Sequence, residues 1–313
     1  MLKQWIKRLA FKPLSTKTRG RVAASLLSSV SADGDIAELE ETVGFVDDRL
    51  VQIEDRIRQL KHSRRRVSSR RTAPLQTFVM DANAPWLAAN VAPVEAPSMI
   101  SDEEAQYYEY IGALYEGRGA AIELGPWLGR STHHIVRGLR KSSHFRSKKL
   151  YVFDDFVWRA SWMDRHVPEH LKLPNHADFR PRFESFVRPI QSDLVVSVGR
   201  ISDALNKDTK LGDYAGNEHL PRIAWDGQPI EIMYIDCGRT AHVNEGWFEV
   251  FSSSFVPDLT LLLMQDWRTH RERPRRPYNQ TLQFTVNHPE LELIHEVSQG
   301  SLATFLCRTA PIP

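Results

Sequence analysis

The sequence contains very little cysteine and no long hydrophobic run. Cys237 and Cys307 are the two cysteines among 313 residues, too few for a disulfide framework or for a zinc site with about four ligands. Such scarcity is typical of a reducing compartment, so we expect a cytoplasmic protein. The longest apolar stretch, from Leu259 to Met264, is interrupted by Thr260 and is far shorter than the ~20 residues of a membrane-spanning helix.

Acidic residues are missing from the first part of the chain. None occurs between Met1 and Ala32, and residues 1–71 carry 16 Lys and Arg against 9 Asp and Glu. The rest of the chain carries 25 basic against 30 acidic residues. A basic arm, residues 1–35, on a mildly acidic body predicts that any polyanion would meet the arm first.

Residues 1–12 have the pattern of an amphipathic helix. Leu2, Trp5, Ile6 and Leu9 share one helical face, and basic residues occupy the remainder. This pattern predicts peripheral contact with an anionic membrane surface. Two alternatives stay open: a basic terminus that packs on the body, and an organellar transit peptide, because the first 32 residues are rich in Arg and Ser.

Heptad spacing marks the next segment, residues 36–71. Apolar residues recur at alternating intervals of three and four, at Ile36, Leu39, Val43, Val46, Leu50, Ile53, Ile57 and Leu60. This seam predicts a coiled coil and self-association through residues 36–60, most simply as a parallel dimer or trimer. The alternative is one amphipathic helix folded back on its own domain, which usually has a wider apolar stripe. Residues 72–100, punctuated by proline, are expected to link this helix to a domain at 101–313.

Short apolar segments alternate with helical patterns from Gly119 onwards. The predicted strands are 120–124, 149–153, 194–198, 230–235, 260–264, 291–297 and 302–307. This alternation predicts an α/β fold, a Rossmann-like sheet of seven strands with helices on both faces. The last two strands are separated only by residues 298–301, so they must form an antiparallel hairpin and make the sheet mixed. Ser101 followed by Glu104 is typical of a capping box and predicts a helix start.

A glycine turn follows the first predicted strand, in the sequence E-L-G-P-W-L-G-R-S-T at 123–132. A strand that turns through glycines into a helix leaves backbone N–H groups available to a ligand. The spacing of Gly125 and Gly129 is G-x-x-x-G, which differs from the dinucleotide-binding pattern.

Acidic residues follow three of the predicted strands. Asp154 ends the second, Asp236 follows the fourth, and Asp266 follows the fifth after one intervening residue. Ligands of open α/β sheets bind at the carboxyl ends of the strands, so we expect these carboxylates to converge on one site.

In this order, the motifs resemble those of the class I S-adenosylmethionine-dependent methyltransferases. They are most similar to the small-molecule and sugar O-methyltransferases grouped with macrocin O-methyltransferase and the cephalosporin-hydroxylase-like proteins, over roughly residues 100–308. The resemblance implies that S-adenosylmethionine is the cofactor and that Asp154 holds its ribose hydroxyls. It implies that Asp236 and Asp266 act at the reacting hydroxyl, in some members through a bound Mg²⁺. Around the methionine end of the cofactor it places Glu123, Gly125, Gly129 and Ser131.

The chain departs from that pattern at three positions. Gln265 stands where relatives often carry the first of two adjacent acids. Arg239 stands where they often carry a histidine, and Arg200 stands where an acid often reads the adenine amino group. These departures keep a second interpretation open, in which the chain is a non-catalytic methyltransferase-like scaffold assembled by its coiled coil, at a membrane surface.

Histidine and arginine are concentrated after the fifth predicted strand. If no metal binds, a base must remove the proton of an alcohol, and His270 is our candidate. Arg268, Arg271 and Arg273 lie beside it, and guanidinium groups bind phosphate and carboxylate through paired hydrogen bonds. We therefore expect a small acceptor that is anionic or glycosylated. The alternatives for this loop are plain solvated surface and a contact with another subunit.

Nucleic acid is not an expected partner. The chain lacks a basic face interleaved with aromatic residues, and it lacks a base pocket of the Asn-Pro-Pro-Tyr type. The basic arm alone would supply phosphate contacts without sequence selectivity.

A long insertion at the predicted carboxyl edge, residues 157–189, contains large apolar side chains. Trp158, Trp162 and Met163 would form a lid that excludes water from the methyl transfer, or would pack as ordinary core residues. The sequence leaves both interpretations open.

Overall fold

The computed structural model describes residues 84–88, 91–201, 216–237, 240–272 and 280–311. All of them belong to one compact unit that spans Ala73–Pro313. The predicted basic arm, the heptad segment and residues 72–83 lie outside the described residues, so membrane contact and self-association stay predictions. Among the described helices, none is long and apolar enough to cross a membrane.

A seven-stranded sheet forms the centre of the unit, with strand order β3-β2-β1-β4-β5-β7-β6. The first five strands are parallel, and β7 runs antiparallel to both β5 and β6. This confirms the predicted Rossmann-like mixed sheet with its terminal hairpin, and each predicted strand boundary agrees to within one residue. The strands are β1 (Ala120–Leu124), β2 (Leu150–Asp154), β3 (Leu194–Val198), β4 (Ile230–Ile235), β5 (Leu261–Met264), β6 (Leu291–Glu296) and β7 (Ala303–Cys307).

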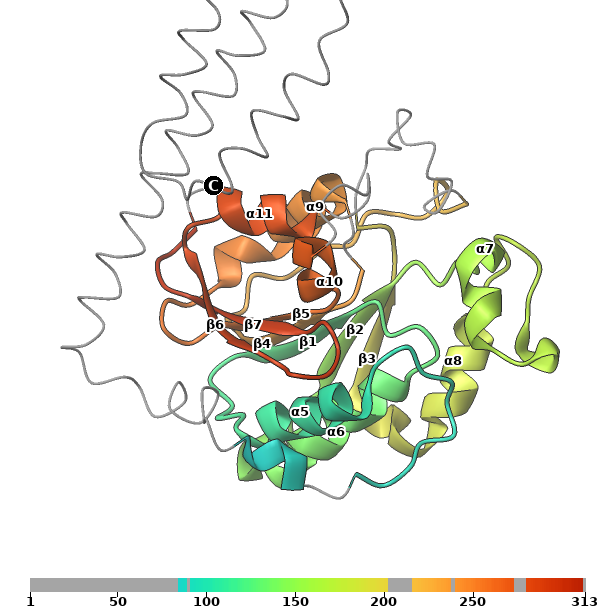
Figure 1. The fold of residues 1–313 in the computed structure, drawn as a ribbon, viewed down its shortest axis with the longest axis horizontal. Helices are drawn as coiled ribbons and strands as arrows, with labels where there is room; N and C mark the ends of the chain where they lie inside the picture. Colours follow the sequence, from blue (N-terminus) through green and yellow to red (C-terminus); the bar gives the residue numbers. More distant parts are fainter. Residues whose placement is uncertain (1–83, 89–90, 202–215, 238–239, 273–279, 312–313) are drawn as a thin grey trace, which may run out of the picture. The chain divides into compact units, whose positions relative to one another are not determined.

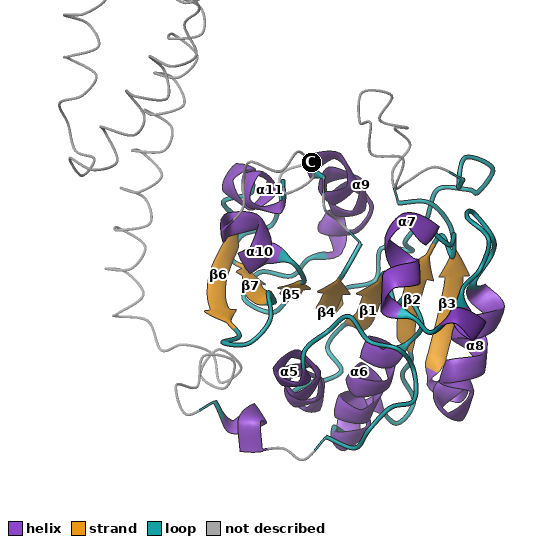
Figure 2. Cartoon of the chain, turned by 45° about the vertical axis from the view of Figure 1, so that its right-hand side comes forward, coloured by secondary structure: helices purple, strands orange, loops and turns teal. Residues whose placement is uncertain are grey.

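Helices cover both faces of the sheet (Figures 1 and 2). Alternate side chains of the central strands therefore enter two separate apolar cores, which is why β1 and β4 are apolar almost throughout. Ala121 belongs to the core beneath α5 and α6, and Ile122 belongs to the core on the opposite face. The helices are α5 (Asp102–Ala113), α6 (Arg130–Lys141), α7 (Ala160–Met163), α8 (Arg180–Val187), α9 (Ala241–Phe251), α10 (Trp267–Glu272) and α11 (Thr281–Asn287).

The first turn of α5 is joined to the turn between β6 and β7. The predicted capping box is confirmed, because the Glu104 N–H donates to Ser101 Oγ and the Ser101 N–H donates to the Glu104 carboxylate. The other oxygen of that carboxylate accepts from the Ser301 N–H at 2.8 Å, and the buried Glu103 carboxylate accepts from Ser298 Oγ at 2.6 Å. Carboxylates are favoured at this end of a helix because they complement its dipole.

Part of the expected linker is built into the domain. Trp86, in the 3-10 helix Pro85–Ala88, is only 2% exposed. Its indole N–H donates to Glu103 at 3.2 Å, and its ring lies edge-on to Tyr107. A buried indole contributes a large apolar area, so the described part of residues 72–100 extends the domain.

Candidate functional site

The strand order reverses between β1 and β4, and this point defines the candidate site. The two strands are adjacent and parallel, while the chain segments that follow them continue toward opposite ends of the sheet. In open α/β sheets, ligands bind in the crevice outside the carboxyl ends of the strands at such a switch point. The candidate site is therefore formed by the residues that follow Leu124 and Ile235.

The turn after β1 requires glycine at both of its predicted positions. Gly125 has a φ of +79° and Gly129 a φ of +92°, and Trp127 between them has a φ of +45°. A Cβ at Gly125 would lie 2.6 Å from the backbone oxygen of Asp236. Gly129 is the N-cap of α6, so no side chain caps the first turn of that helix. Uncapped N–H groups at a helix N-terminus favour an anionic group.

Glu123 lies beneath this turn with its carboxylate only partly satisfied. Its Oε1 accepts a hydrogen bond from Ser131 Oγ at 2.6 Å. Its Oε2 is buried and has no hydrogen-bond partner among the described residues. Tyr234, the residue that pairs with Glu123 on β4, likewise has a buried hydroxyl with no hydrogen-bond partner among them. Burial raises the pKa of Glu123 to about 7, although the Ser131 hydrogen bond and the nearby Thr132 hydroxyl oppose this. A cationic ligand group would supply the missing partner.

Two adjacent carboxylates at the end of β2 have different environments. Asp155 accepts two hydrogen bonds from the Arg159 guanidinium and one from Asn217 at 2.8 Å. Burial alone would raise the pKa of Asp155, but these partners hold it below its usual range. Burial and the Asp155 charge raise the pKa of Asp154, whose Oδ1 accepts from the Phe156 N–H. Asp155 thus anchors the loop, and Asp154 is the acid better placed to receive ligand hydroxyls.

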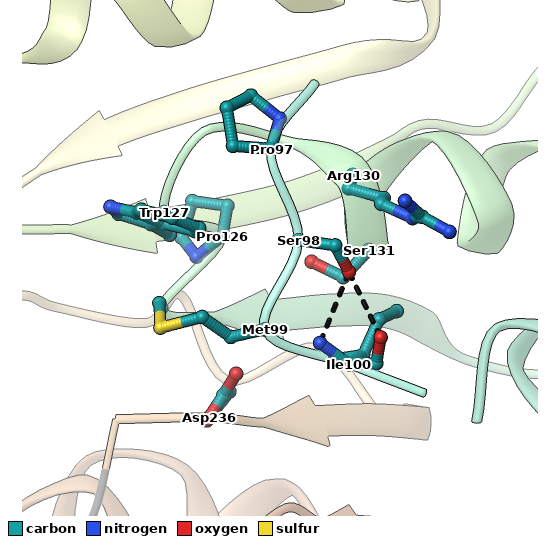
Figure 3. A pocket seen from close by; sticks show the side chains of 10 residues that line it. Pro97, Ser98, Met99, Ile100, Pro126, Trp127, Arg130, Ser131 and Asp236 are labelled. Atoms are coloured by element: carbon teal, nitrogen blue, oxygen red, sulfur yellow. Dashed lines mark hydrogen bonds between the residues drawn. The ribbon is translucent and has the colours of Figure 1, made fainter. Parts of the chain in front are cut away.

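A small cavity of about 20 Å³ lies at the switch point (Figure 3). Three predicted site residues, Gly125, Ser131 and Asp236, line it together. Asp236 is exposed. The remaining lining residues are Pro97, Ser98, Met99, Ile100, Pro126, Trp127 and Arg130.

Cys237 interacts electrostatically both with Asp236, which lines this cavity, and with the acids at the end of β2. Burial raises the pKa of its thiol well above the usual value, and the charges of Asp236, Asp154 and Asp155 raise it further. The Cys237 Cβ would also lie 3.3 Å from a Cβ at Gly125. The Cys237 thiol therefore lies within electrostatic reach of two of the three predicted carboxylates, Asp154 and Asp236.

The departure at Gln265 has a structural reason. Its side chain is buried, and its Nε2 donates to Glu104 Oε1 at 2.8 Å. Its Oε1 accepts from the Tyr108 hydroxyl at 3.1 Å. An amide satisfies both neighbours at once, whereas a carboxylate here would face the Glu104 carboxylate.

Asp266 does not line the cavity. Its backbone is left-handed, with a φ of +61°, and its Oδ1 accepts from Ser301 Oγ at 3.3 Å. It is not among the residues that line the cavity with Asp236. Within the described ranges, no group of three or more His, Cys, Asp or Glu side chains is placed to hold a metal ion. The described residues therefore give no support to the implied Mg²⁺ site at Asp236 and Asp266.

The arginine segment is described only in part. The Arg268 guanidinium donates to the carbonyls of Val297 and Ser298, at 3.1 and 2.8 Å, and so holds the hairpin turn. Substrate binding by Arg268 is not tested by these contacts. The side chains of His270 and Arg271, both on α10, and the whole of Arg273 lie outside the described residues. Their predicted roles stay predictions.

Sequence reasoning missed the segment Pro97–Ile100 and Arg130 as lining residues. Arg130 directly follows the glycine turn and could have been found from that position alone. Pro97–Ile100 gave no signal, because its place beside the turn depends on tertiary packing. The insertion at 157–189 packs its Trp158 and Met163 side chains into the core, as in the second of the two interpretations.

Comparisons with known proteins gave fold-level matches alone. No protein-family model matches the chain, and no curated protein sequence does. Among solved structures, a candidate O-methyltransferase from Klebsiella pneumoniae is 13% identical, with 77% of this chain and 93% of that one covered and a TM-score of 0.42. CalS11, a TDP-rhamnose 3'-O-methyltransferase of calicheamicin biosynthesis, is 13% identical, with 76% and 96% covered and a TM-score of 0.38.

A third solved structure is the methyltransferase PaMTH1 of Podospora anserina with SAH bound. It is 12% identical, with 96% of this chain and 99% of that one covered and a TM-score of 0.40. At such identities and scores the matches carry no statement about activity. The Rossmann-like fold of this chain rests on its own strand order and register.

Proposed function

We propose that residues 101–313 form an S-adenosylmethionine-dependent methyltransferase domain that methylates an oxygen of a small acceptor. One observation carries the proposal. At the switch point of the sheet, Gly125, Ser131 and Asp236 line one cavity. The half-satisfied buried carboxylate of Glu123 accepts a hydrogen bond from Ser131, and Asp154 ends the neighbouring strand β2. This is the place where ligands of open α/β sheets bind.

The chemistry of these residues fits the groups of the cofactor. The unsatisfied oxygen of Glu123 suits an ammonium group, and the uncapped first turn of α6 with Ser131 suits a carboxylate. The Asp154 carboxylate suits the two hydroxyls of a ribose. The bound cofactor would supply a methyl group activated by an adjacent sulfonium.

On the acceptor side, Asp236 would orient the reacting hydroxyl. An alcohol does not ionise near neutral pH, so a base must take its proton. Asp236 is exposed at the cavity and is one candidate. His270, on the helix after β5, is the other. Arg271 and Arg273 would bind an anionic or glycosylated acceptor, and the proposal assigns no step to a metal ion.

Calorimetric titration with S-adenosylmethionine and S-adenosylhomocysteine tests the proposal. Both should bind the wild-type chain, and Asp154→Ala should weaken binding by about 1–3 kcal/mol because hydrogen bonds to the ribose are lost. Asp193→Ala is the matched control. That residue precedes β3 at the opposite edge of the sheet and pairs with Arg140, so binding should be unchanged. If neither compound binds wild type or any variant described below, the scaffold interpretation replaces this one.

A further inference from the structure

A segment of the predicted linker crosses the candidate site. We call residues 92–101 the strap. Four of its residues, Pro97–Ile100, line one side of the switch-point cavity, and Gly125, Ser131 and Asp236 line the rest with their neighbours (Figure 3). The strap therefore lies over the same backbone turn that the proposed cofactor would contact.

Both ends of the strap are anchored by hydrogen bonds. At its start, the Arg137 guanidinium of α6 donates to the carbonyls of Ala92 and Pro93, the second at 3.3 Å. At its end, Ser101 caps α5 and its Oγ donates to the carbonyl of Gln299 at 3.0 Å. The ends are thus fixed to two helices and to the hairpin turn.

The middle of the strap is held more weakly. Ser98 Oγ accepts from the Ile100 N–H at 3.2 Å and donates to the Ile100 carbonyl at 2.9 Å. In the described part of the chain, these are the hydrogen bonds found for residues 94–100. Met99 and Ile100 are half-buried and pack against the core beneath α5 and α6. Segments held by few hydrogen bonds and limited apolar contact open at low free-energy cost.

The space left beneath the strap is too small for the proposed cofactor. A cavity of about 20 Å³ has room for roughly one water molecule. Gly125 and Ser131, which the proposed cofactor would contact, line this space, so a ligand larger than a water molecule reaches them there only when the strap is displaced.

We infer that the strap is a gate on the cofactor site, which opens when residues 94–100 lift from the glycine turn between their fixed ends. This inference rests on the proposed function. The closed form competes with the ligand. The apparent affinity and the association rate are therefore proportional to the fraction of molecules in which the strap is open.

Stopped-flow binding of S-adenosylhomocysteine to the full chain, followed by tryptophan fluorescence, tests the gate. Arg137→Ala removes the upstream anchor, and Ser98→Ala removes the local turn. Each should raise the association rate roughly three- to tenfold by raising the open population, where tenfold corresponds to about 1.4 kcal/mol. Arg140→Ala is the matched control, because this arginine of the same helix pairs with Asp193 instead and should leave the rate unchanged.

Amide hydrogen exchange of residues 94–100 gives a readout independent of the ligand. Exchange should be faster in both strap variants than in wild type, and bound S-adenosylhomocysteine, which excludes the closed strap, should make it faster in wild type. Equal association rates and equal strap exchange in every protein would overturn the gate while leaving the proposed function intact. Binding by the loosened variants alone would support both. If no protein binds, the proposed function fails and the gate fails with it.

Discussion

Glu123 is the residue at which stability and ligand binding are expected to oppose each other. Burial raises the pKa of its carboxyl from 4.5 to about 7. The folded state then binds the proton more tightly than the unfolded state, so the free energy of unfolding falls as pH rises from about 4.5 to about 7. Above that range the domain carries an ionised and partly unsatisfied buried carboxylate.

Glu123→Gln should therefore stabilise the domain at pH 8. The amide oxygen still accepts from Ser131, and the cost of burying a charge disappears, so we expect a gain of about 1–3 kcal/mol at pH 8 and a smaller difference at pH 5. The same change should weaken S-adenosylhomocysteine binding. Urea unfolding at both pH values measures the change in the free energy of unfolding. The control is the Glu116→Gln variant, because the Glu116 side chain is half-exposed. A variant with the pH dependence of wild type would contradict this account.

The sequence identified several site residues because their signals are local. Gly125 and Gly129 stand directly after an apolar strand, and Asp236 ends another, so their meeting follows from strand polarity alone. The sequence also named Asp154 at the end of β2. The two adjacent acids differ in their partners, because Asp155 forms an ion pair with Arg159. That ion pair depends on how the loop after β2 packs.

At the scale of elements, the first turn of α5 fixes the strand ends at one side of the site. Glu104 accepts hydrogen bonds from Ser301 in the hairpin turn and from Gln265 at the end of β5. Its carboxylate thus joins a helix, a hairpin and a central strand. Gln265, one of the departures from the methyltransferase pattern, is thus part of the contact between α5, the hairpin and β5.

Gln265→Glu should be destabilising for this reason. The new carboxylate would face the Glu104 carboxylate in a buried environment, and we expect a loss of about 1–3 kcal/mol at neutral pH. Thermal unfolding at pH 7 and pH 5 tests this, since protonation at the lower pH should recover part of the loss. Gln283→Glu, on the exposed side of α11, is the matched control. Equal melting temperatures for the two variants would argue against the connection.

Element boundaries were predictable where one local signal dominated. Buried parallel strands are short apolar runs, and the capping box at Ser101 marked the start of α5. By contrast, α10 and α11 were not predicted, because they flank an arginine-rich stretch with weak apolar periodicity. The packing of the strap gives no local signal, because its anchors at Arg137 and Gln299 are distant in sequence.

At the scale of the whole molecule, the heptad seam predicts assembly independent of the compact unit Ala73–Pro313. A chain lacking residues 1–72 should fold, bind S-adenosylhomocysteine and form a lower-order species, because the compact unit begins at Ala73. Light scattering on both proteins tests this prediction. Removing residues 1–100 is the informative comparison, because it also deletes Trp86 and the strap and should destabilise the domain. Full-length protein that is monomeric at tens of micromolar would contradict the prediction that residues 36–60 self-associate.

The pairing of β1 with β4 also has a consequence for synthesis of the chain. Ala120 pairs with Ile230, so β1 leaves the ribosome long before its second neighbour. At ~5–20 residues per second, the delay is roughly 5–20 s. During that interval the nascent half-sheet β3-β2-β1 presents an open, apolar edge where β4 will later add, and such edges invite pairing with other chains. The centre of the sheet is thus the part of this protein with the greatest need of chaperone protection before release.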